Sequence, residues 1–406
     1  MQEIFDFIEG STALAVELET KLCKLPAVSP DSGGQGEIDK TEFLERWLKE
    51  HGVTNIERFD APDKRAKGGV RPNIVATIHG NSEKRLWIIS HLDVVPPGER
   101  SLWNSDPWVL VEKDGRLIGR GVEDNQQGLV SSCLAALAFV KNNVKPDFTV
   151  KLLFAADEEM GSKFGILWLI ENSPDLFCTD DVALIPDSGD SKGQSIEIAE
   201  KNLVWLKFTT SGVQAHGSRP DRGNNAHLAG AYLLTMLYER LSTKFNARDS
   251  LFEPDSSTFQ PTKKETNVPN VNTIPGVDIF YMDMRILPQY SLREVFDEIN
   301  EVKSEIESCF KVKITYEICQ QSESKATAAD APLVKRLSAA VKEIYSVDTK
   351  PIGIGGGTVA ASLRNRGIDA VVWARLDDTA HQPNEYALVS NIIGDAKVMA
   401  RLMCSE

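Results

Sequence analysis

The sequence predicts an α/β fold, in which a discontinuous domain with a mostly parallel sheet flanked by helices carries an inserted two-layer α+β domain. Two observations predict this fold. Before residue 198 and after residue 322, short apolar runs alternate with longer helix-like stretches, as in a parallel sheet covered by helices. Between these points the pattern reads strand, helix, strand, helix, strand. We therefore assign 1–198 and 322–406 to the discontinuous domain and 199–321 to the inserted domain.

The first half supplies the strands and helices of the parallel sheet. The apolar runs 73–79 and 86–91 are short and bounded by turn residues, as buried strands are. Residues 128–141 are rich in Leu and Ala and too long for a strand, so we expect a helix there. The alternation continues with a strand, a helix and a strand at 149–156, 163–172 and 182–186.

The rest of the chain is read in the same way. The inserted domain is expected to contain three strands and two helices, at 203–210, 225–243, 278–287, 291–309 and 311–318. The polar stretch 246–270 predicts a long loop. The α/β style then returns with a helix, a glycine cluster, a strand and a closing helix, at 331–346, 353–357, 370–374 and 386–403.

Charge and composition exclude several classes of protein. Among 406 residues, 45 Lys and Arg stand against 59 Asp and Glu, a net charge of −14, so we expect no nucleic acid and no membrane as partner. No apolar run approaches the ~18–20 residues of a membrane span. The six cysteines show no metal-type spacing, which indicates reduced thiols and a cytoplasmic protein.

Carboxylates and a histidine gather where predicted strands end or the long helix begins. In an open α/β sheet, ligands bind beyond the carboxyl ends of the strands, so the loops are expected to meet at one crevice. A single such residue is usually a cap, and adjacent glutamates are usually solvated. Together they would bury so much negative charge that a bound cation is needed. The residues are His91, Asp93, Asp124, Glu158, Glu159 and Asp187.

The residue types indicate the chemistry. Imidazole nitrogen and carboxylate oxygen suit Zn²⁺ or a similar divalent ion, and these loops hold no cysteine. Asp93 follows His91 by two residues and is expected to orient its ring. Of Glu158 and Glu159, one can bind metal while the other handles a proton. His381, in a polar loop before the last helix, would complete the ligand set.

The other histidines carry less information. His216 lies in the inserted domain, far in sequence from the strand-end residues. His51, His79 and His227 have no supporting neighbours, so we expect them to be structural or on the surface.

Nine short motifs run in order along nearly the whole chain: S-H-L-D-V-V-P, G-R-G-V-E-D, E-E-M-G, P-D-S-G, S-G-V-Q-A-H-G-S-R-P, V-N-T-I-P, M-D-M-R, G-G-G-T and A-H-Q-P-N-E. In this order they resemble the motifs of the dinuclear-zinc amidohydrolase and carboxypeptidase family. This family includes acetylornithine deacetylase, succinyl-diaminopimelate desuccinylase, aminoacylase and the glutamate carboxypeptidases.

The resemblance implies two divalent metal ions, with Zn²⁺ preferred and Co²⁺ or Mn²⁺ as alternatives. Asp124 would bridge them. His91 and Asp187 would complete the ligands of one ion, and Glu159 and His381 those of the other. It also implies a cis peptide after Asp124.

The resemblance further implies residues that act on the substrate. Glu158 would be the general base and Asp93 would orient the metal-binding histidine. His216 would reach the active site of the partner in a homodimer and stabilise the developing oxyanion, since the inserted domain of the family is a lid and dimerisation domain. Asn272 and Arg285 would hold the substrate carboxylate. In the G-G-G-T motif, backbone would approach the ligand at Gly356, Gly357 and Thr358.

Two positions depart from the family pattern and leave the substrate open. Gln126 stands where many members have Lys, and Val359 where many have Asp. We expect hydrolysis of the amide bond of an N-acyl amino acid, because V-N-T-I-P and A-H-Q-P-N-E-Y resemble the deacylases. A dipeptidase or carboxypeptidase acting on a short peptide is the alternative. A metal-binding relative without turnover is less favoured, because Glu158 is present.

Overall fold

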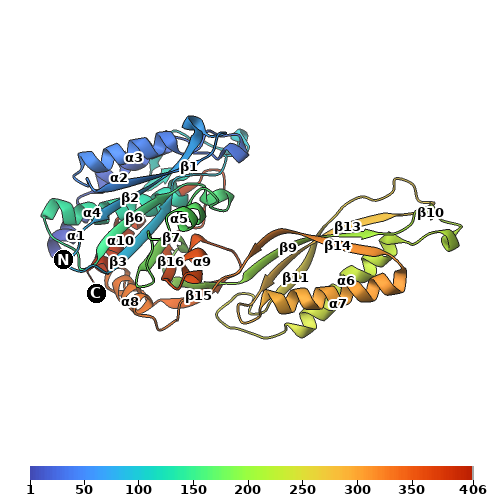
Figure 1. Ribbon diagram of the computed structural model, residues 1–406. Helices are drawn as coiled ribbons and strands as arrows, with labels where there is room; N and C mark the ends of the chain where they lie inside the picture. Colours follow the sequence, from blue (N-terminus) through green and yellow to red (C-terminus); the bar gives the residue numbers. More distant parts are fainter. Residues whose placement is uncertain (405–406) are drawn as a thin grey trace. The chain divides into compact units, whose positions relative to one another are not determined.

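The computed structural model describes residues 1–404 (Figure 1). Its contacts divide the chain into a first unit, Met1–Ile198, Thr327–Pro351 and Ser362–Glu406, and a second unit, Ala199–Ala326 and Ile352–Ala361. Sequence analysis placed 322–406 entirely in one domain, whereas the structure groups 352–361 with the second unit. The reason is local, because Lys201 N–H donates to the Ile354 carbonyl at 3.0 Å and Arg285 to the Gly355 carbonyl at 2.6 Å.

The first unit is built on an eight-stranded sheet in the order β1-β2-β6-β3-β7-β16-β8-β15. Strands β6, β3, β7 and β16 run parallel, while β1, β2 and β8 pair antiparallel with their neighbours. The predicted α/β class is confirmed, and the sheet is mixed. Its strands are Ile56–Pro62, Val70–Ile78, Thr149–Ala155, Arg85–His91, Val182–Asp190, Asp369–Arg375, Ser195–Glu200 and Lys350–Ile354.

Helices flank this sheet, with α4 at their centre. Every residue of α4 from Gly128 to Phe139 is buried, as its Leu- and Ala-rich sequence requires. A Cβ atom on Gly128 would lie 2.4 Å from the Pro186 carbonyl oxygen, so this glycine lets α4 start against the end of β7. The helices are α1 (Gln2–Glu9), α2 (Thr12–Cys23), α3 (Ile38–Glu50), α4 (Gly128–Asn142), α5 (Ile166–Asn172), α8 (Pro332–Tyr345), α9 (Val359–Asn365) and α10 (Val389–Met403).

A small sheet in the order β17-β5-β4 completes the first unit. Its strands are short: β4 covers Val111–Lys113, β5 covers Arg116–Ile118 and β17 covers Tyr386–Leu388. Strand β17 directly precedes α10, so the loop between β16 and β17 is fixed at both ends. Among residues 1–404, no helix is both long and apolar enough to cross a membrane.

The second unit has two layers, a four-stranded antiparallel sheet in the order β11-β13-β9-β14 and two helices that cover one of its faces (Figure 1). Alternate residues of β9 and β13, such as Phe208 and Phe280, point into a core shared with α6 and α7. The elements are β9 (Asn202–Ser211), α6 (Ala226–Lys244), β11 (Thr258–Lys264), β13 (Val277–Ile286), α7 (Leu292–Phe310) and β14 (Lys313–Ser322).

One element of the second unit corrects the sequence analysis. The predicted loop 246–270 contains β11, which pairs with β13. The strand is irregular between Pro261 and Lys263 and exposes most of its side chains, so its apolar pattern is weak. A proline in a strand is tolerated at a bulge or at a sheet edge, and β11 is an edge strand.

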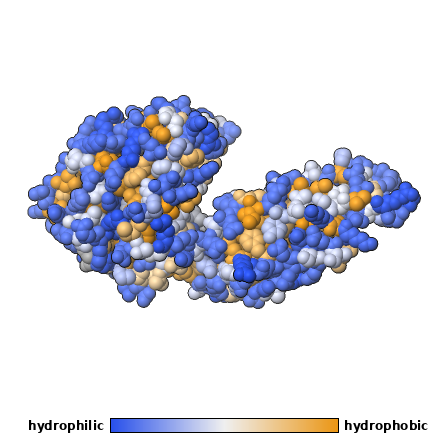
Figure 2. Space-filling view, in the orientation of Figure 1, coloured by the Kyte–Doolittle hydropathy of each residue, from blue (hydrophilic) through white to orange (hydrophobic). Residues whose placement is uncertain are grey.

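The surface of both units is mostly hydrophilic, with scattered apolar patches (Figure 2). Several of the exposed large apolar residues belong to the second unit: Val213, Leu228, Tyr232, Tyr238, Val271, Val277 and Ile318.

Candidate metal centre

Two groups of potential metal ligands meet in the first unit and share Asp124. In one group, Nε2 of His91 lies 2.9 Å from Oδ1 of Asp124 and 3.3 Å from Oδ1 of Asp187. In the other, Nε2 of His381 lies 3.1 Å from Oδ2 of Asp124 and 3.0 Å from Oε2 of Glu159. The two oxygens of one carboxylate therefore face two separate histidines.

The parallel strands explain why these residues meet. His91 is the last residue of β3, Asp187 lies in the second half of β7, and Glu159 follows the end of β6. The three strands are neighbours and run in the same direction, so their carboxyl ends lie at one edge of the sheet. Asp124 comes from the segment Val122–Gln127 that leads into α4.

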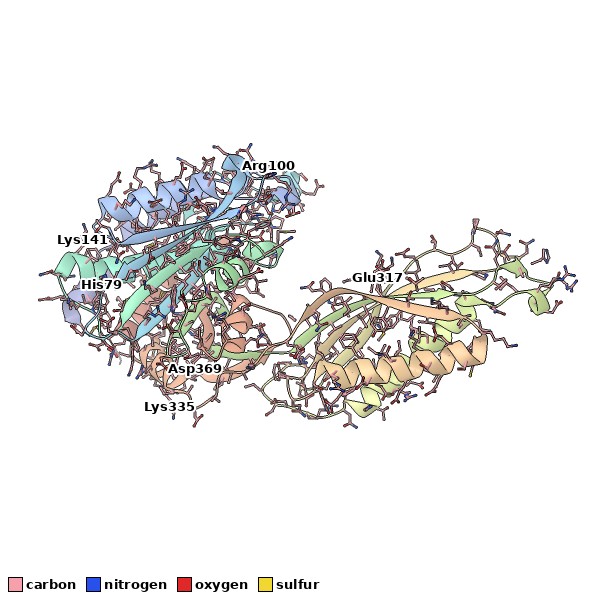
Figure 3. The ribbon with its side chains drawn as sticks, viewed as in Figure 1. His79, Arg100, Lys141, Glu317, Lys335 and Asp369 are labelled. Carbon is pink, nitrogen blue, oxygen red and sulfur yellow. The ribbon has the colours of Figure 1, made fainter. Side chains whose placement is uncertain are left out.

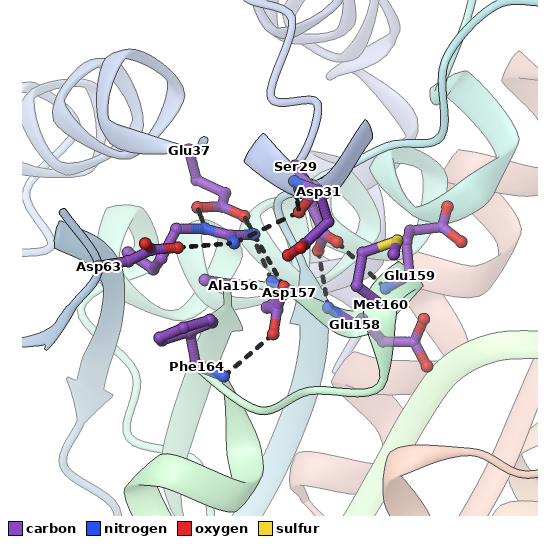
Figure 4. A network of polar contacts seen from close by, with 12 residues as sticks. Ser29, Asp31, Glu37, Asp63, Ala156, Asp157, Glu158, Glu159, Met160 and Phe164 are labelled. Atoms are coloured by element: carbon purple, nitrogen blue, oxygen red, sulfur yellow. Dashed lines mark hydrogen bonds and ion pairs between the residues drawn. The ribbon is translucent and has the colours of Figure 1, made fainter. Parts of the chain in front are cut away.

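Asp93 has a different main contact from the one predicted. Nδ1 of His91 lies 3.0 Å from the backbone carbonyl of Asp93 and 3.5 Å from its carboxylate. The carboxylate instead accepts the backbone N–H groups of Glu158 and Glu159, at 3.0 and 3.1 Å. The backbone carbonyl of Asp93 thus orients the histidine, and its carboxylate fixes the segment that carries Glu158 and Glu159. Figure 4 shows these two glutamates side by side.

The segment around Asp124 is held by Glu385, a buried carboxylate of the A-H-Q-P-N-E motif. Its oxygens accept the N–H groups of Gly121, Glu123 and Asp124 at 2.9, 3.0 and 3.1 Å, and Nη1 of Arg120 at 2.6 Å. The peptide bond between Asp124 and the next residue is cis, which confirms that prediction. The hydrogen bonds to Glu385 fix the backbone that presents Asp124.

Two further contacts tie the ligand loops together. Asn125 donates from Nδ2 to the Pro186 carbonyl and to Oδ1 of Asp187, each at 2.7 Å. The carboxylate of Glu123 accepts the N–H of Asp377 at 2.7 Å and the hydroxyl of Thr379 at 2.7 Å. The loop that carries His381 is therefore anchored to the segment that carries Asp124.

The clustered carboxylates of this site favour a positive charge among them. The carboxylates of Asp124 and Glu159 raise the pKa of His381 to about 10. Burial lowers the pKa of His91, but the charges of Asp187 and Asp124 outweigh it and raise that pKa well above its usual value. Burial, together with the charge of Asp187, raises the pKa of Glu158. In the metal-free protein, protons on the histidines balance part of the negative charge.

The donor set fits two divalent ions. Each group supplies one imidazole nitrogen and carboxylate oxygens, all within 4.8 Å of one another, and the shared Asp124 has one oxygen in each group. Oε1 of Glu159 is buried without a hydrogen-bond partner among residues 1–404. Such a donor set suits zinc and related transition-metal ions.

These findings agree with comparisons to known proteins. The model of peptidase family M20/M25/M40 matches residues 87–405. The chain belongs to this family. An uncharacterised metallohydrolase of Methanocaldococcus jannaschii is 40% identical over 403 residues, covering 96% of this chain and 98% of the relative. A succinyl-diaminopimelate desuccinylase of Rickettsia bellii is 25% identical over 376 residues, covering 90% of each.

A solved M20 metallo-carboxypeptidase of Sulfolobus solfataricus shares the fold with a TM-score of 0.73, at 18% identity, covering 96% of this chain and 98% of that structure. The protein is therefore a metal-dependent hydrolase of the M20 family. The segment that matches the family, residues 87–405, includes every residue of the two ligand groups.

The structure separates the substrate residues predicted in the second unit of this M20 hydrolase. His216, in β10 (Ala215–His216), pairs with Thr273 of β12 (Thr273–Ile274), and the carbonyl of Asn272 accepts the N–H of Gly217. Arg285 lies near the far end of β13, whose ten residues span about 30 Å. In one chain, His216 and Asn272 therefore lie together, and Arg285 does not join them.

Arg285 and the glycine-rich segment contact each other directly. The guanidinium of Arg285 donates to the Asp283 carboxylate at 2.7 and 3.0 Å and to the Gly355 carbonyl at 2.6 Å. Thr358, after Gly356 and Gly357, donates from its N–H and hydroxyl to Glu200 at 3.1 and 2.7 Å. Part of the donor capacity of Arg285 is thus used to hold this segment.

The three histidines expected to be structural make local contacts away from these ligands. Nδ1 of His51 donates to the Trp47 carbonyl at 2.8 Å. His79 follows β2 and contacts Asn55 at 3.0 Å (Figure 3). His227 lies 2.9 Å from the buried Asp278 of the second unit.

Sequence reasoning missed the residues that hold the ligand loops. Glu385 and Glu123 lie inside motifs that were recognised, one residue or a few residues from a predicted ligand. Arg71, Glu37 and Asp157 form a buried ionic cluster next to Glu158. The sequence holds no clear signal for Arg71, because an arginine near the start of a strand is usually exposed, and only the fold shows that this one is buried.

Proposed function

We propose that this M20 hydrolase cleaves the amide bond of an N-acyl amino acid, with two zinc ions bound at the candidate metal centre. The observation that carries the proposal is the carboxylate of Asp124, whose two oxygens face His91 and His381 at 2.9 and 3.1 Å. His91 and Asp187 would hold one ion, and Glu159 and His381 the other. Bound metal would polarise the scissile carbonyl and lower the pKa of the attacking water.

Glu158 supplies the proton transfer in this proposal. It removes a proton from the water as the water oxygen bonds to the carbonyl carbon, and it delivers that proton to the amide nitrogen as the C–N bond breaks. The products are a carboxylate and a free amine. Burial supports this role, because it raises the pKa of Glu158 and so strengthens the carboxylate as a base.

We further propose that the enzyme is a homodimer. His216 and Asn272 lie at the opposite end of β13 from Arg285, so one substrate cannot contact all three in a single chain. His216 would therefore stabilise the oxyanion in the site of a second copy. Asn272, which lies beside His216, would contact the substrate carboxylate in that same site. The exposed apolar residues of α6, Leu228 and Tyr232, support a protein partner for the second unit.

Arg285, Gly356, Gly357 and Thr358 remain proposed substrate contacts. We also propose a cytoplasmic location, and the free thiols of all six cysteines support it.

A panel of amine-release assays tests the function. The substrates are N-acetylornithine, N-succinyl-diaminopimelate, simple N-acetyl amino acids and dipeptides including carnosine, each with chelated enzyme and with Zn²⁺, Co²⁺ or Mn²⁺ restored. Metal-restored release of amine from an N-acyl amino acid is the expected result. Turnover of dipeptides alone would show that the enzyme is a peptidase and not a deacylase. Silence across the panel, with two metals bound, would contradict the proposed substrate class.

The homodimer has its own test. A mixture of His216→Ala with Asp124→Ala subunits should regain part of the activity that each variant lacks, because one site of the mixed dimer keeps all its residues. Subunit exchange without any regain of activity would place His216 outside the partner's site.

A further inference from the structure

We propose that Arg71 is a positioning residue, which places the Glu158–Glu159 segment through Glu37 and Asp157. This inference rests on the proposed function, because it concerns the same base and metal ligand. It adds a buried ionic cluster, whose acidic residues Glu37 and Asp63 lie on the other side of Asp157 from Glu158 and Glu159 (Figure 4).

The guanidinium of Arg71 is the centre of this cluster. Its side chain is fully buried, and Nε donates to Oε2 of Glu37 at 2.6 Å while Nη2 contacts the other oxygen of Glu37. The same Nη2 lies 3.0 Å from Oδ1 of Asp157, and Nη1 lies 3.8 Å from Asp63. The ring of Phe164 packs 5.5 Å from the guanidinium. One arginine thus joins three acidic residues from three separate segments.

Asp157 connects the cluster to the catalytic segment. It is the residue before Glu158 and has φ of 66°, a left-handed backbone conformation that needs support from its surroundings. Its N–H donates to Oε1 of Glu37 at 3.3 Å, and its Oδ2 accepts the N–H of Phe164 at 3.1 Å. Arg71 therefore fixes Asp157 both directly and through Glu37.

The segment is held from two sides. Arg71 and Glu37 hold Asp157, and the carboxylate of Asp93 holds the next two N–H groups. A small rotation at Asp157 would move the side chains of Glu158 and Glu159 together. The base and one metal ligand would then lose their alignment, while the ligands on β3 and β7 would keep theirs. Loss of the cluster should therefore impair the base Glu158 and the metal side that contains Glu159, and leave the other metal side intact.

Arg364 offers a matched control. It is also a buried arginine of the first unit, donating to Glu197 at 2.8 Å and to the Ala370 carbonyl at 2.9 Å. Neither partner belongs to the two ligand groups. If the buried contacts of Arg71 only stabilise the fold, then Arg71→Lys and Arg364→Lys should have equal effects on activity and metal binding.

The test compares Arg71→Lys and Asp157→Asn with Arg364→Lys and the natural enzyme. Three quantities are measured: the thermal unfolding midpoint, the affinity of each of two Co²⁺ sites followed by absorption without substrate, and kcat and KM. We expect Arg71→Lys and Asp157→Asn to lower kcat by about 100-fold with KM within about twofold. We expect one Co²⁺ site to weaken by about 10–100-fold and the other to stay unchanged.

The outcomes are distinct. Equal effects of Arg71→Lys and Arg364→Lys on kcat and on both Co²⁺ sites would overturn the inference and leave Arg71 as a structural residue. Asp157→Asn keeps an oxygen for the Phe164 N–H, so it carries the test where Arg71→Lys does not fold. The Co²⁺ readout is independent of substrate. A selective loss of one site in an enzyme inactive on every substrate would support the positioning role and contradict only the proposed function.

Discussion

The two ligand groups of the candidate metal centre are built in different ways. On the first side, His91 and Asp187 come from neighbouring parallel strands, and the His91 side chain is only 3% exposed. On the second side, Glu159 and His381 lie on loops, and the His381 side chain is 56% exposed. The sheet backbone fixes the first side, whereas the second depends on hydrogen-bonding carboxylates that hold its loops. We therefore expect mutations to change the metal affinities of the two sides by different amounts.

The largest expected effect is a loss of metal affinity on both sides at once. Asp124→Ala deletes the carboxylate that both groups share, so both metal affinities should fall by more than the ~10–100-fold typical of supporting residues. Elemental analysis after gel filtration measures this loss, with the unfolding midpoint of the metal-free protein as the folding control. Two tightly retained ions would contradict the bridging role of Asp124.

The next effect separates catalysis from binding. Glu158→Gln removes the proton acceptor while keeping the shape of the side chain, so kcat should fall by about 10²–10⁴-fold with both metals retained. Steady-state kinetics and metal analysis on the same preparation check this. A variant with more than a tenth of the natural kcat would remove Glu158 as the base.

A smaller effect should distinguish the two sides directly. Glu123→Gln weakens the contacts to Asp377 and Thr379 that anchor the His381 loop. The ion on the second side should then bind about 10-fold more weakly, and the ion on the first side should be unaffected. Competition with a chelator gives both affinities. An equal loss at both sites would show that the loops and the strands form one rigid unit.

The smallest effect is a dependence on pH. In the metal-free protein, the carboxylates of Asp124 and Glu159 raise the pKa of His381 from 6.5 to about 10. Its folded-state pKa is the higher one, so its stabilisation of the metal-free fold is complete below pH 6.5 and is lost as pH rises through about 10.

Metal must displace this proton. Metal affinity should therefore rise with pH up to about 10, with proton release on binding at pH 7. Calorimetry in buffers of different ionisation enthalpy measures the protons released. Binding without proton release would show that His381 is neutral in the metal-free protein.

The sequence predicted the parts of this enzyme that have local signals. The apolar runs predicted the central strands, and several polar residues at or near their ends are candidate ligands that the structure brings together. The weak strand β11 escaped prediction because its side chains are mostly exposed and Pro261 interrupts its pairing. Local sequence does not show which segment an edge strand will join.

The supporting residues were harder to predict for another physical reason. Arg71 and Glu37 are 34 positions apart, and Glu385 lies 261 positions from Asp124, so only the folded chain shows these pairs. The spacing along the strand predicted that Asp93 contacts His91, and its carboxylate lies 3.5 Å from Nδ1. The same spacing could not show that this carboxylate also accepts N–H groups from another loop.

The most direct test of the central claim is a metal titration of activity. Enzyme freed of metal by a chelator is reconstituted with zero to three equivalents of Zn²⁺, and amine release from the best N-acyl amino acid of the panel is measured at each point. We expect no turnover without metal and full turnover only at two equivalents. Undiminished turnover by the chelated enzyme, or a plateau at one equivalent, would contradict a dinuclear centre shared through Asp124.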